Sequence, residues 1–389
     1  MAGRTHNRPF AIDARMLGRE GTGVATYAAA LSDTLTRAGL SPILVSDSSC
    51  GQPMARAGLA ARSVRWADAL VDRPRLLRAG GGALTGRDIF RLAQVHFDRH
   101  GTMLRLIAPG PSGIIHWTYP LPIRIEGWIN IYTVHDAIPI LHPRLSQIDP
   151  VRHLRLLRAV AASAEHLLTV SESARADIVA AIGCDPALIS ACPPGLDVRA
   201  PADAVLLAGL RRDGFLLFAG SVEPRKNLLR LAEAHRRSGS SYPLVIAGPD
   251  GWRSEEIAPR LAADPTIVRL PYVDRPTLMA LMANARALAF PTITEGFGLP
   301  IVEAMQLGAA VLTARGGATE EVAGGAALLA DPMSVEDLAI QIGRLSDDAT
   351  VARLRADGLA RGSAFSAAAF ATRLGAVHTR LLAKTSPNG

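Results

Sequence analysis

Residues 290–304 read FPTITEGFGLPIVEA and place two carboxylates, Glu295 and Glu303, eight positions apart. The apolar run before them, residues 287–290, predicts a buried strand, and Pro300 suits the first residue of a helix. We therefore expect Glu295 on the loop at the carboxyl end of a strand and Glu303 in the first turns of the next helix. In an open α/β sheet ligands bind in that crevice, and carboxylates there accept hydrogen bonds from a polyhydroxyl ligand.

The glycines between the two carboxylates decide between two interpretations. If the two glutamates stood alone, Glu295 would be a solvated side chain and Glu303 would only complement the helix dipole. Gly296 and Gly298, however, let backbone N–H groups approach a ligand closely. Together with the motifs described below, they favour a binding site.

Length and composition indicate a two-domain protein. A chain of 389 residues is too long for one ordinary core, and no apolar run reaches the ~18 residues of a transmembrane helix. The N-terminal segment MAGRTHNRPFAID has no apolar signal region. Three cysteines without metal-type spacing are typical of a reducing compartment, so we expect a cytoplasmic protein.

The charge is basic, with a net +7 and a pI near 9.9. Such a balance fits nucleic acid, an anionic membrane surface or a phosphorylated small molecule. Residues 56–105 hold ten arginines against four aspartates, but no aromatic ladder accompanies them, which disfavours nucleic acid. Arg152, Arg155 and Arg158 would extend this patch into a basic rim at the inner face of the membrane, and a solvated helix face is the alternative.

The C-terminal half alternates apolar runs with helix-length segments, the pattern of βαβ units and a parallel sheet. The expected strands are Phe215–Ala219, Leu244–Ala247, Ile267–Leu270, Ala287–Phe290, Ala310–Thr313 and Ala327–Ala330.

The N-terminal half repeats the pattern less regularly. Its expected strands are Phe10–Asp13, Ile43–Val45, Ile114–Trp117, Ile129–Val134 and Leu167–Val170, with a first helix from Gly23 to about Arg37. For residues 47–112 we expect helices and one mobile loop around Gly80–Gly82.

These elements predict an α/β protein with two Rossmann-like doubly wound domains that face each other across a cleft. Residues 1–200 would form the N-terminal domain and residues 201–366 the C-terminal domain. Residues 367–389 would form a last helix that packs back across the junction, followed by a frayed tail.

A second motif, GSVEPRKN at residues 220–227, follows the strand that ends at Ala219 and opens a helix. Arg225 and Lys226 would then lie beside a helix N-terminus, where free N–H groups, the dipole and two cations make a diphosphate site. A solvated basic loop with an asparagine cap is the alternative, but it would not need Gly220 at the strand end.

Two weaker signals lie in the N-terminal half. His135 and Asp136 end a strand, where the histidine could contact a substrate hydroxyl or a phosphate with Asp136 orienting it; a structural histidine is the alternative. Gly21-Thr-Gly23 opens the first helix but departs from G-x-G-x-x-G because Thr26 holds the sixth position. An anion or substrate contact there is still compatible with the sequence.

The sequence predicts no metal site. It has no G-x-x-x-x-G-K-[ST] loop and no Asp-x-Asp pair for a divalent cation. His96 and His100 have helical spacing but lack a third ligand, so we interpret them as a solvated face.

Together these motifs resemble the retaining glycosyltransferases of family 4, which adopt the GT-B fold. Residues 295–303 resemble the E-x7-E motif of that family, and residues 220–227 resemble its G-[ST]-x-x-[PR]-x-K-N-like loop. The first Gly-rich loop and the strand-terminal histidine also match. The resemblance extends from about residue 10 to residue 370, with residues 47–112 unplaced.

The resemblance implies a role for each domain and each motif. Residues 1–200 would be the acceptor-binding domain and residues 201–366 the nucleotide-sugar-binding domain. Arg225 and Lys226 would bind the donor diphosphate in place of a metal, and His135 would contact the transferred sugar. Glu295 would bind the hydroxyls of the donor sugar and Glu303 the ribose. The other donor-binding positions would be Gly21, Gly23, Gly220, Ser221, Tyr272, Val273, Gly296, Phe297, Gly298 and Leu299.

The implied activity is transfer of a hexosyl group, best matched by mannose from GDP-mannose, to a hydroxyl of a glycan. The acceptor would be a lipid-linked oligosaccharide in bacterial polysaccharide assembly, with no cofactor beyond the nucleotide-sugar donor. Glucose, rhamnose and N-acetylglucosamine donors are also compatible. The alternatives are a non-catalytic GT-B subunit that supports a partner enzyme and a GT-B sugar-nucleotide epimerase.

Overall fold

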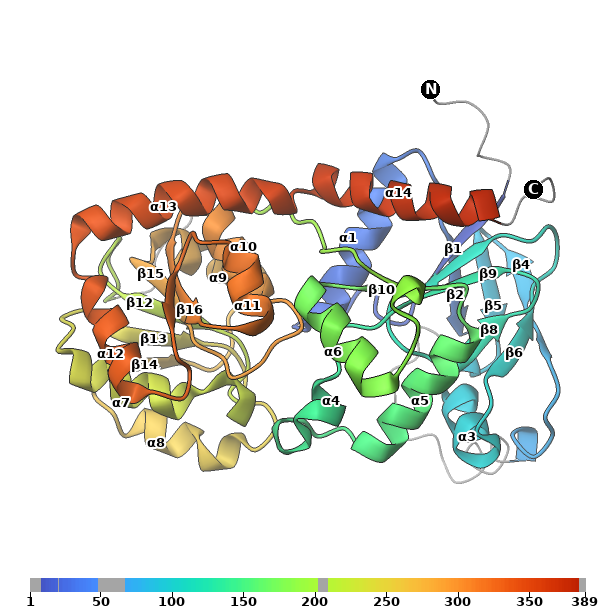
Figure 1. Ribbon diagram of the computed structural model, residues 1–389, viewed down its shortest axis with the longest axis horizontal. Coiled ribbons are helices and arrows are strands. Elements are labelled where there is room, and N and C mark those ends of the chain that lie inside the picture. The colour runs from blue at the N-terminus through green and yellow to red at the C-terminus, as the bar shows by residue number, and fades with distance from the viewer. Residues whose placement is uncertain (1–7, 20, 48–66, 202–208, 385–389) are drawn as a thin grey trace.

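Two parallel sheets, one in each half of the chain, organise the molecule into two lobes (Figure 1). The computed structural model describes residues 8–19, 21–47, 67–201 and 209–384. Both halves alternate strands with helices along the sequence, so the predicted pair of doubly wound α/β domains is confirmed. The domain boundaries after residues 200 and 366 stay predictions.

The N-terminal sheet has the strand order β11-β10-β9-β7-β1-β2-β5-β4, and within it only the β4–β5 pair is antiparallel. Its strands are β1 Phe10–Asp13, β2 Ile43–Asp47, β4 Arg78–Gly80, β5 Ala83–Gly86, β7 Ile114–Trp117, β9 Ile129–Thr133, β10 His166–Thr169 and β11 Ile189–Ala191. A small second sheet holds β3 Arg75–Leu76, β6 Leu104–Ile107 and β8 Ile123–Ile125. The helices are α1 Gly23–Arg37, α3 Ile89–His100, α4 Ile138–Leu141, α5 Pro150–Ser163 and α6 Glu172–Ile182, with 3-10 turns η1 Pro143–Leu145 and η2 Pro186–Leu188.

The C-terminal sheet is entirely parallel, in the order β14-β13-β12-β15-β16-β17. Its strands are β12 Leu216–Ala219, β13 Leu244–Ala247, β14 Ile267–Leu270, β15 Ala287–Phe290, β16 Ala310–Ala314 and β17 Leu328–Ala330. Its helices are α7 Leu228–Ser238, α8 Ala258–Ala262, α9 Arg275–Asn284, α10 Leu299–Gln306, α11 Gly317–Ala323, α12 Val335–Arg344 and α13 Asp348–Gly362, with 3-10 turns η3 Pro224–Lys226, η4 Ser254–Glu256 and η5 Ser363–Phe365. The central strands are buried at every position, which explains why they appear in the sequence as continuous apolar runs.

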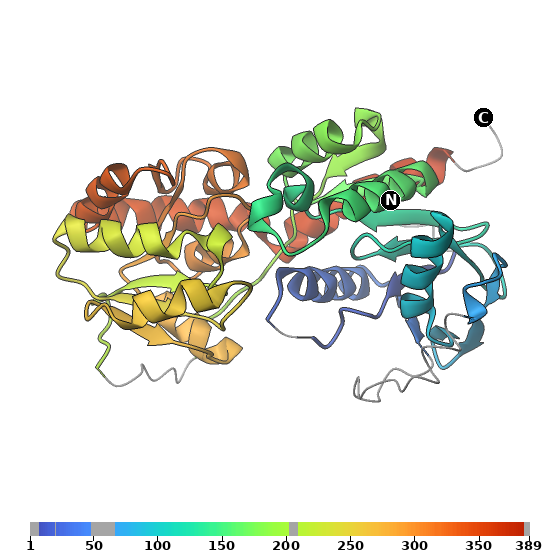
Figure 2. The ribbon, with the colours of Figure 1, turned by 90° about the horizontal axis from the view of Figure 1, so that it is seen from below.

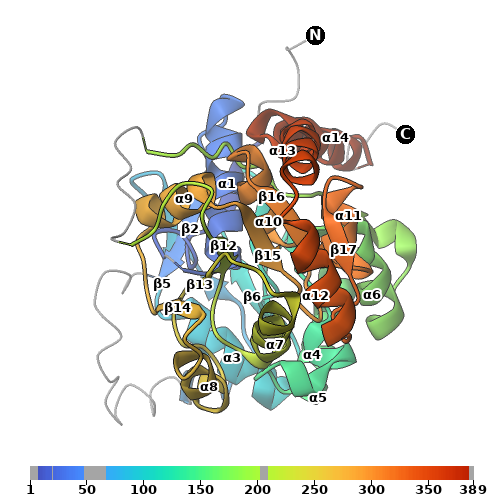
Figure 3. The same cartoon turned by 90° about the vertical axis from the view of Figure 1, so that its left-hand side faces the viewer.

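Helices cover both faces of the C-terminal sheet. In the view of Figure 3, α7, α8 and α12 lie below the strands, and α9, α10 and α13 lie above them. The order of strands reverses between β12 and β15, because β12 is followed by β13 on one side while β15 is its neighbour on the other. The helices that leave these two strands therefore go to opposite faces, which opens a crevice at their carboxyl ends.

The lobes are joined by two crossings of the chain, near residues 192–201 and 362–367. The last helix, α14 Ala367–Lys384, runs from the junction along the N-terminal lobe and packs on α1 (Figure 1). Seen from below, the N-terminus of α1 faces the C-terminal lobe (Figure 2). The side chain of Gln306, at the end of α10, bonds both crossings: its amide nitrogen donates to the Leu196 and Gly362 carbonyls, and its oxygen accepts from Val198.

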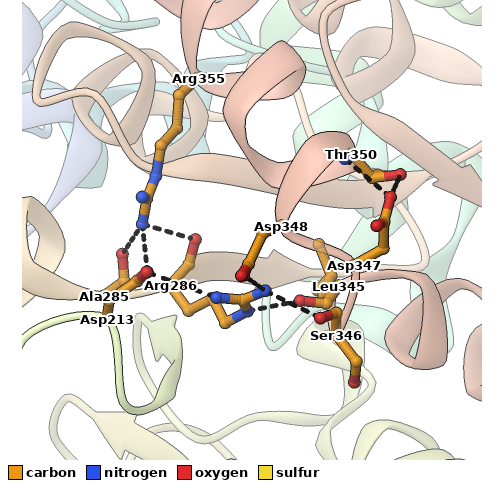
Figure 4. Close-up of polar contacts among 9 residues, drawn as sticks. All are labelled: Asp213, Ala285, Arg286, Leu345, Ser346, Asp347, Asp348, Thr350 and Arg355. Carbon is orange, nitrogen blue, oxygen red and sulfur yellow. Dashed lines mark hydrogen bonds and ion pairs between the residues drawn. The ribbon is translucent and has the colours of Figure 1, made fainter.

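A buried arginine anchors the end of the C-terminal sheet that lies away from the crevice (Figure 4). The Arg286 guanidinium donates to Asp348 at 2.7 Å and to Asp213 at 3.4 Å, and it stacks on the Tyr242 ring at 4.7 Å. It also donates to the carbonyls of Leu345 and Ser346. Arg355 adds a second contact to Asp213. This network ties the start of α13 to the strands, so it serves stability.

Most predicted elements are confirmed, including the first helix from Gly23 to Arg37. The expectation for residues 47–112 was wrong in part, because β3 to β6 lie there and Gly81 and Gly82 form the turn of the β4–β5 hairpin. Residues 48–66 lie outside the described ranges. His96 is buried rather than solvated, and its ring bonds Thr102.

Two of the three arginines of α5 are held against α3, whereas Arg158 donates to the Ile182 carbonyl at the end of α6. Arg152 donates to Asp98 at 2.6 Å, and the Arg155 guanidinium lies 5.1 Å from the centre of the Phe97 ring. Neither of the two interpretations of these arginines, a solvated helix face or a free basic rim, included such contacts. Contact with the membrane stays a prediction. Within the described residues, no helix has both the length and the apolarity needed to cross a bilayer.

Candidate active site

The crevice between β12 and β15 brings two sequence motifs together. The loop after β12 leads through η3 into α7, and the loop after β15 leads into α10. The backbone of Ile293 donates to the Arg225 carbonyl at 2.9 Å, so the two loops are hydrogen-bonded to each other. The GSVEPRKN motif and the E-x7-E motif therefore form one site.

Glu295 is the centre of this site. One carboxylate oxygen contacts Arg225 Nη1 at 2.5 Å, and the other contacts Lys226 Nζ at 2.7 Å. Arg225 also reaches Glu223 at 2.6 Å, and the Lys226 ammonium lies 5.0 Å from the centre of the Phe290 ring. Two cations and two carboxylates thus meet at the ends of β12 and β15.

Burial and pairing act against each other on these charges. Burial works to raise the pKa of Glu295, but Arg225 and Lys226 outweigh it and hold that pKa below its ordinary value. Burial lowers the pKa of Lys226, whose residue is 8% exposed, although Glu295 opposes the shift. An anion that enters here must compete with Glu295 for both cations.

Glu303 is buried in α10 and makes its own ion pair. Its Oε1 lies 2.6 Å from Nη1 of Arg275, the first residue of α9. Burial raises the pKa of Glu303, and Arg275 opposes that shift. The two carboxylates of the motif therefore belong to different charge clusters, one on each side of the α10 N-terminus.

The glycines of the motif allow close approach. A Cβ at Gly296 would lie 2.6 Å from the carbonyl oxygen of His135 in the other lobe, so the two backbones touch there. Gly298 forms the N-cap of α10 and has φ +111°, a backbone conformation that residues other than glycine rarely adopt. The ring of Phe297 packs edge-on against the ring of Phe365, with 5.5 Å between the ring centres, and this contact holds the loop in place.

His135 lies at the carboxyl end of β9 and faces this loop. Its Nε2 bonds the Thr118 carbonyl at 2.9 Å. Because a carbonyl only accepts, Nε2 carries the proton and Nδ1 is left as an acceptor. Burial lowers the pKa of His135 to about 4, so the ring is neutral at pH 7. The expectation that Asp136 orients His135 was wrong, because the Asp136 carboxylate accepts from its own Ile138 N–H.

A chain of buried polar groups lies behind His135. The Tyr27 ring meets the His135 ring edge-on at 5.1 Å, and its hydroxyl bonds Thr133 at 2.9 Å. His116 bonds the same threonine at 2.8 Å. These contacts fix the face of the histidine that points away from the C-terminal lobe.

The two lobes touch beside the site. Ser171, the N-cap of α6, donates its hydroxyl to the Gly296 carbonyl at 2.7 Å. Glu321 of α11 accepts from the backbone N–H groups of Glu172 and Ser173 at 2.9 and 2.8 Å. The Glu321 carboxylate, which belongs to the C-terminal lobe, therefore lies at the N-terminus of α6 in the other lobe, a favourable position for negative charge.

The remaining predicted positions surround the same crevice. A Cβ at Gly23, the first residue of α1, would lie 3.4 Å from Leu299, so the N-termini of α1 and α10 face each other. Gly21 is exposed in the loop before α1, and Tyr272 is 64% exposed after β14 with Val273 beside it. Gly220 and Ser221 start the loop after β12.

Several residues at the site were missed from the sequence, namely Glu223, Arg275, Thr118, Ser171 and Glu321. Arg275 also borders a pocket of about 440 Å³ between the lobes, which α1, residues 195–201 and the start of α9 enclose. Within the described residues, no group of His, Cys, Asp and Glu could hold a metal ion. Facing helix N-termini and paired cations fit a diphosphate, and the carboxylates fit hydroxyl groups.

Comparison with known families agrees with this geometry. Residues 21–200 match the family described as Glycosyltransferase Family 4. Residues 210–358 match the family described as Glycosyl transferases group 1.

Two curated relatives and one solved structure illustrate the similarity. The O-antigen chain mannosyltransferase B of Escherichia coli is 32% identical over 262 residues, which cover 63% of this chain and 68% of that protein. The serotype-specific mannosyltransferase WbdA of Escherichia coli is 28% identical over 208 residues, which cover 47% of this chain and only 26% of WbdA. The sucrose-phosphate synthase of Thermosynechococcus elongatus has a TM-score of 0.71 at 19% identity, covering 97% of this chain and all of that one. The last similarity concerns the fold, which is GT-B.

Proposed function

Starting from the fact that the chain belongs to glycosyltransferase family 4, the retaining hexosyltransferases with the GT-B fold, we propose that it transfers mannose from GDP-mannose. The acceptor is a hydroxyl group of a lipid-linked glycan in bacterial polysaccharide assembly. The enzyme works at the inner face of the membrane and takes no nucleic acid as partner.

One observation carries this proposal. Arg225, Lys226 and Glu295 form a single cluster at the point where the strand order reverses, and His135 of the other lobe faces the same loop. A non-catalytic subunit has no need of buried charges there, since replacing a buried ion pair by well-packed apolar residues is often neutral or stabilising.

The cations act on the leaving group. Cleavage of the bond between sugar and diphosphate puts negative charge on the diphosphate and oxocarbenium character on the sugar. Arg225 and Lys226, held beside the crevice, stabilise that charge more strongly in the transition state than in the ground state. The acceptor hydroxyl attacks from the face that the diphosphate leaves, and a departing phosphate oxygen takes its proton, so the anomeric configuration is retained.

His135 and the two glutamates orient the donor. The neutral His135 offers Nδ1 as an acceptor for a hydroxyl of the transferred sugar. Glu295 turns from its cations to the sugar hydroxyls as the diphosphate takes its place. Glu303 accepts the hydroxyls of the ribose, and Tyr272 borders the base.

Mannose is the proposed sugar because both mannosyltransferases reported above act, by their names, on mannose. The glycan acceptor is proposed because the first of these relatives is named for an O-antigen chain. The guanine base rests on the resemblance of the sequence motifs to bacterial polysaccharide mannosyltransferases. Donors of glucose, rhamnose or N-acetylglucosamine are the competing choices.

A donor screen tests the proposal. Purified protein is heated with GDP-mannose, UDP-glucose, dTDP-rhamnose and UDP-N-acetylglucosamine, since a ligand that binds the folded state raises Tm by mass action. We expect the largest rise with GDP-mannose, and release of GDP that increases when a lipid-linked mannan oligosaccharide is added. Activity should survive EDTA.

The other outcomes are equally informative. Turnover of the nucleotide sugar to its epimer without any acceptor would indicate an epimerase. Binding without turnover under all conditions would indicate a supporting subunit. A larger shift with another donor would replace mannose by that sugar.

A further inference from the structure

Arg275 contacts one of the two carboxylates of the E-x7-E motif, although it belongs to neither motif. We propose that Arg275 is a positioning residue for donor binding: its guanidinium keeps the Glu303 carboxylate ionised and oriented to accept hydrogen bonds from the ribose hydroxyls of the nucleotide. This inference rests on the proposed function, because it requires a nucleoside diphosphate as ligand.

The geometry holds Arg275 in place at its backbone and leaves its side chain accessible. Asp274 caps α9 by accepting from Thr277 N–H at 2.9 Å, and Pro276 occupies the first turn, so the start of the helix is fixed. The Arg275 side chain is 50% exposed, whereas that of Glu303 is 5% exposed. The ion pair is made through Oε1 of Glu303, so Oε2 stays available to accept from a ligand, and Arg275 itself borders the interlobe pocket.

A buried carboxylate without a partner takes up a proton instead of staying charged. For Glu303 burial already raises the pKa while Arg275 is present, and Arg275 is the charged group that opposes this shift. Removing the guanidinium should therefore move the titration of Glu303 toward neutral pH. A protonated carboxyl group has less acceptor capacity and would hold a ribose diol more weakly.

The other charged side chains near α10 face elsewhere. In α11, Glu320 accepts from Gly316 N–H and Glu321 accepts from the start of α6. In α13, Arg355 contacts Asp213, and Arg361 donates to backbone carbonyls of α11.

The strands beside α10 and the loop before it do not supply a competing partner. Arg286, the residue before β15, is bonded within the network at the opposite end of the sheet. Glu295, in the loop before α10, is paired with Arg225 and Lys226. The ionisation of Glu303 thus depends on Arg275.

The test measures binding of GDP and of UDP by calorimetry between pH 6 and pH 8.5, without any turnover. The variants are Arg275→Ala, Arg275→Lys and Glu303→Gln, with Arg260→Ala on the exposed face of α8 as the matched control. The titration of the nucleotide phosphate is common to all proteins, so it cancels in the ratio of each variant to the wild type.

We expect Arg275→Ala to weaken binding about tenfold at pH 6.5 and by a smaller factor as the pH rises, because a larger share of Glu303 is then ionised without the guanidinium. Arg275→Lys keeps the positive charge and should restore the wild-type pH profile. Glu303→Gln should weaken binding by a factor that does not change with pH, and Arg260→Ala should match the wild type.

Two results would overturn the inference. One is an Arg275→Ala protein whose loss of affinity is the same at every pH, which would make Arg275 a simple contact or a structural residue. The other is unchanged affinity in that variant. If the wild type binds neither GDP nor UDP, the proposed function itself fails and the inference falls with it, so the two failures are distinguishable.

Discussion

Replacing Glu295 by glutamine should tighten the binding of free GDP while it lowers transfer. In the structure the carboxylate holds both Arg225 and Lys226 through short contacts. A diphosphate must take these cations from Glu295, so the carboxylate that helps the sugar competes with the leaving group. Glutamine has the same size but competes far less, because its amide carries no charge.

The magnitude follows from the contacts. A charge-assisted hydrogen bond is worth roughly 1.5–3 kcal/mol, and two unit charges at about 4 Å attract by about 4 kcal/mol at an effective dielectric constant of 20. Since GDP regains part of one such contact in the variant, we expect a gain of about 1.5 kcal/mol, or roughly tenfold in Kd. The kcat for GDP-mannose should fall by more than tenfold, because the sugar hydroxyls lose a charged acceptor in the transition state.

Calorimetry with GDP at constant ionic strength is the appropriate assay. It should be run at pH 6.5, because burial lowers the pKa of Lys226 and the loss of Glu295 would lower it further. Glu223→Gln is the matched control: that carboxylate contacts Arg225 but not Lys226, so its effect should be smaller. Equal or weaker binding of GDP to Glu295→Gln would refute the competition that the geometry indicates.

Three further predictions concern closure, folding and acid stability. Glu321→Ala removes the acceptor at the start of α6, so the lobes should separate and the radius of gyration should rise. The lost interaction of ~1 kcal/mol should lower kcat/KM about fivefold, and an unchanged radius would contradict this prediction. Arg286→Leu should cost about 3 kcal/mol of unfolding free energy in urea, because the Leu345 and Ser346 carbonyls lose their buried donor. A variant as stable as the wild type would show that the network contributes nothing. Burial lowers the pKa of His378 to about 4, so as the pH falls below ~6.5 this histidine takes up a proton in the unfolded chain before it does so in the folded protein. Relative to its effect at pH 7.5, His378→Phe should therefore raise the free energy of unfolding by about 2 kcal/mol at pH 5. Equal effects at the two pH values would place the pKa of His378 near its ordinary value.

The fold was largely predictable because its central strands are buried on both faces. Their apolar runs are short and continuous, and the breaks between them carry helix-start residues such as Pro300. The segment after β2 was not predictable in the same way. Its strands β3 and β4 hold mostly intermediate or exposed residues, among them Arg75 and Arg78. Edge strands of this kind lack the apolar pattern that identifies a strand.

The candidate site was predictable where chemistry follows a motif and unpredictable where it depends on pairing across the fold. The ends of β12 and β15 are adjacent only because the strand order reverses there, and the sequence gives no register for that. The pairing of Glu295 with both cations, and of Glu303 with Arg275, therefore came from the structure. An Arg beside an N-cap aspartate carries no distinguishing signal, so Arg275 had to be missed.

The contacts between the lobes indicate that the conformation of the loop between β15 and α10 does not depend on the C-terminal lobe alone. Gly296 lies against the His135 carbonyl, and Ser171 holds the Gly296 carbonyl oxygen. Glycine has the greatest backbone freedom of any residue, so this segment depends on outside contacts for its conformation. The same N-terminal lobe supplies His135, the residue that we propose contacts the sugar, and a change that opens the lobes therefore displaces both the loop and the histidine. Rate constants and donor affinity should respond together to such a change, whereas a variant of Arg275 should alter affinity and leave kcat at saturating donor almost unchanged.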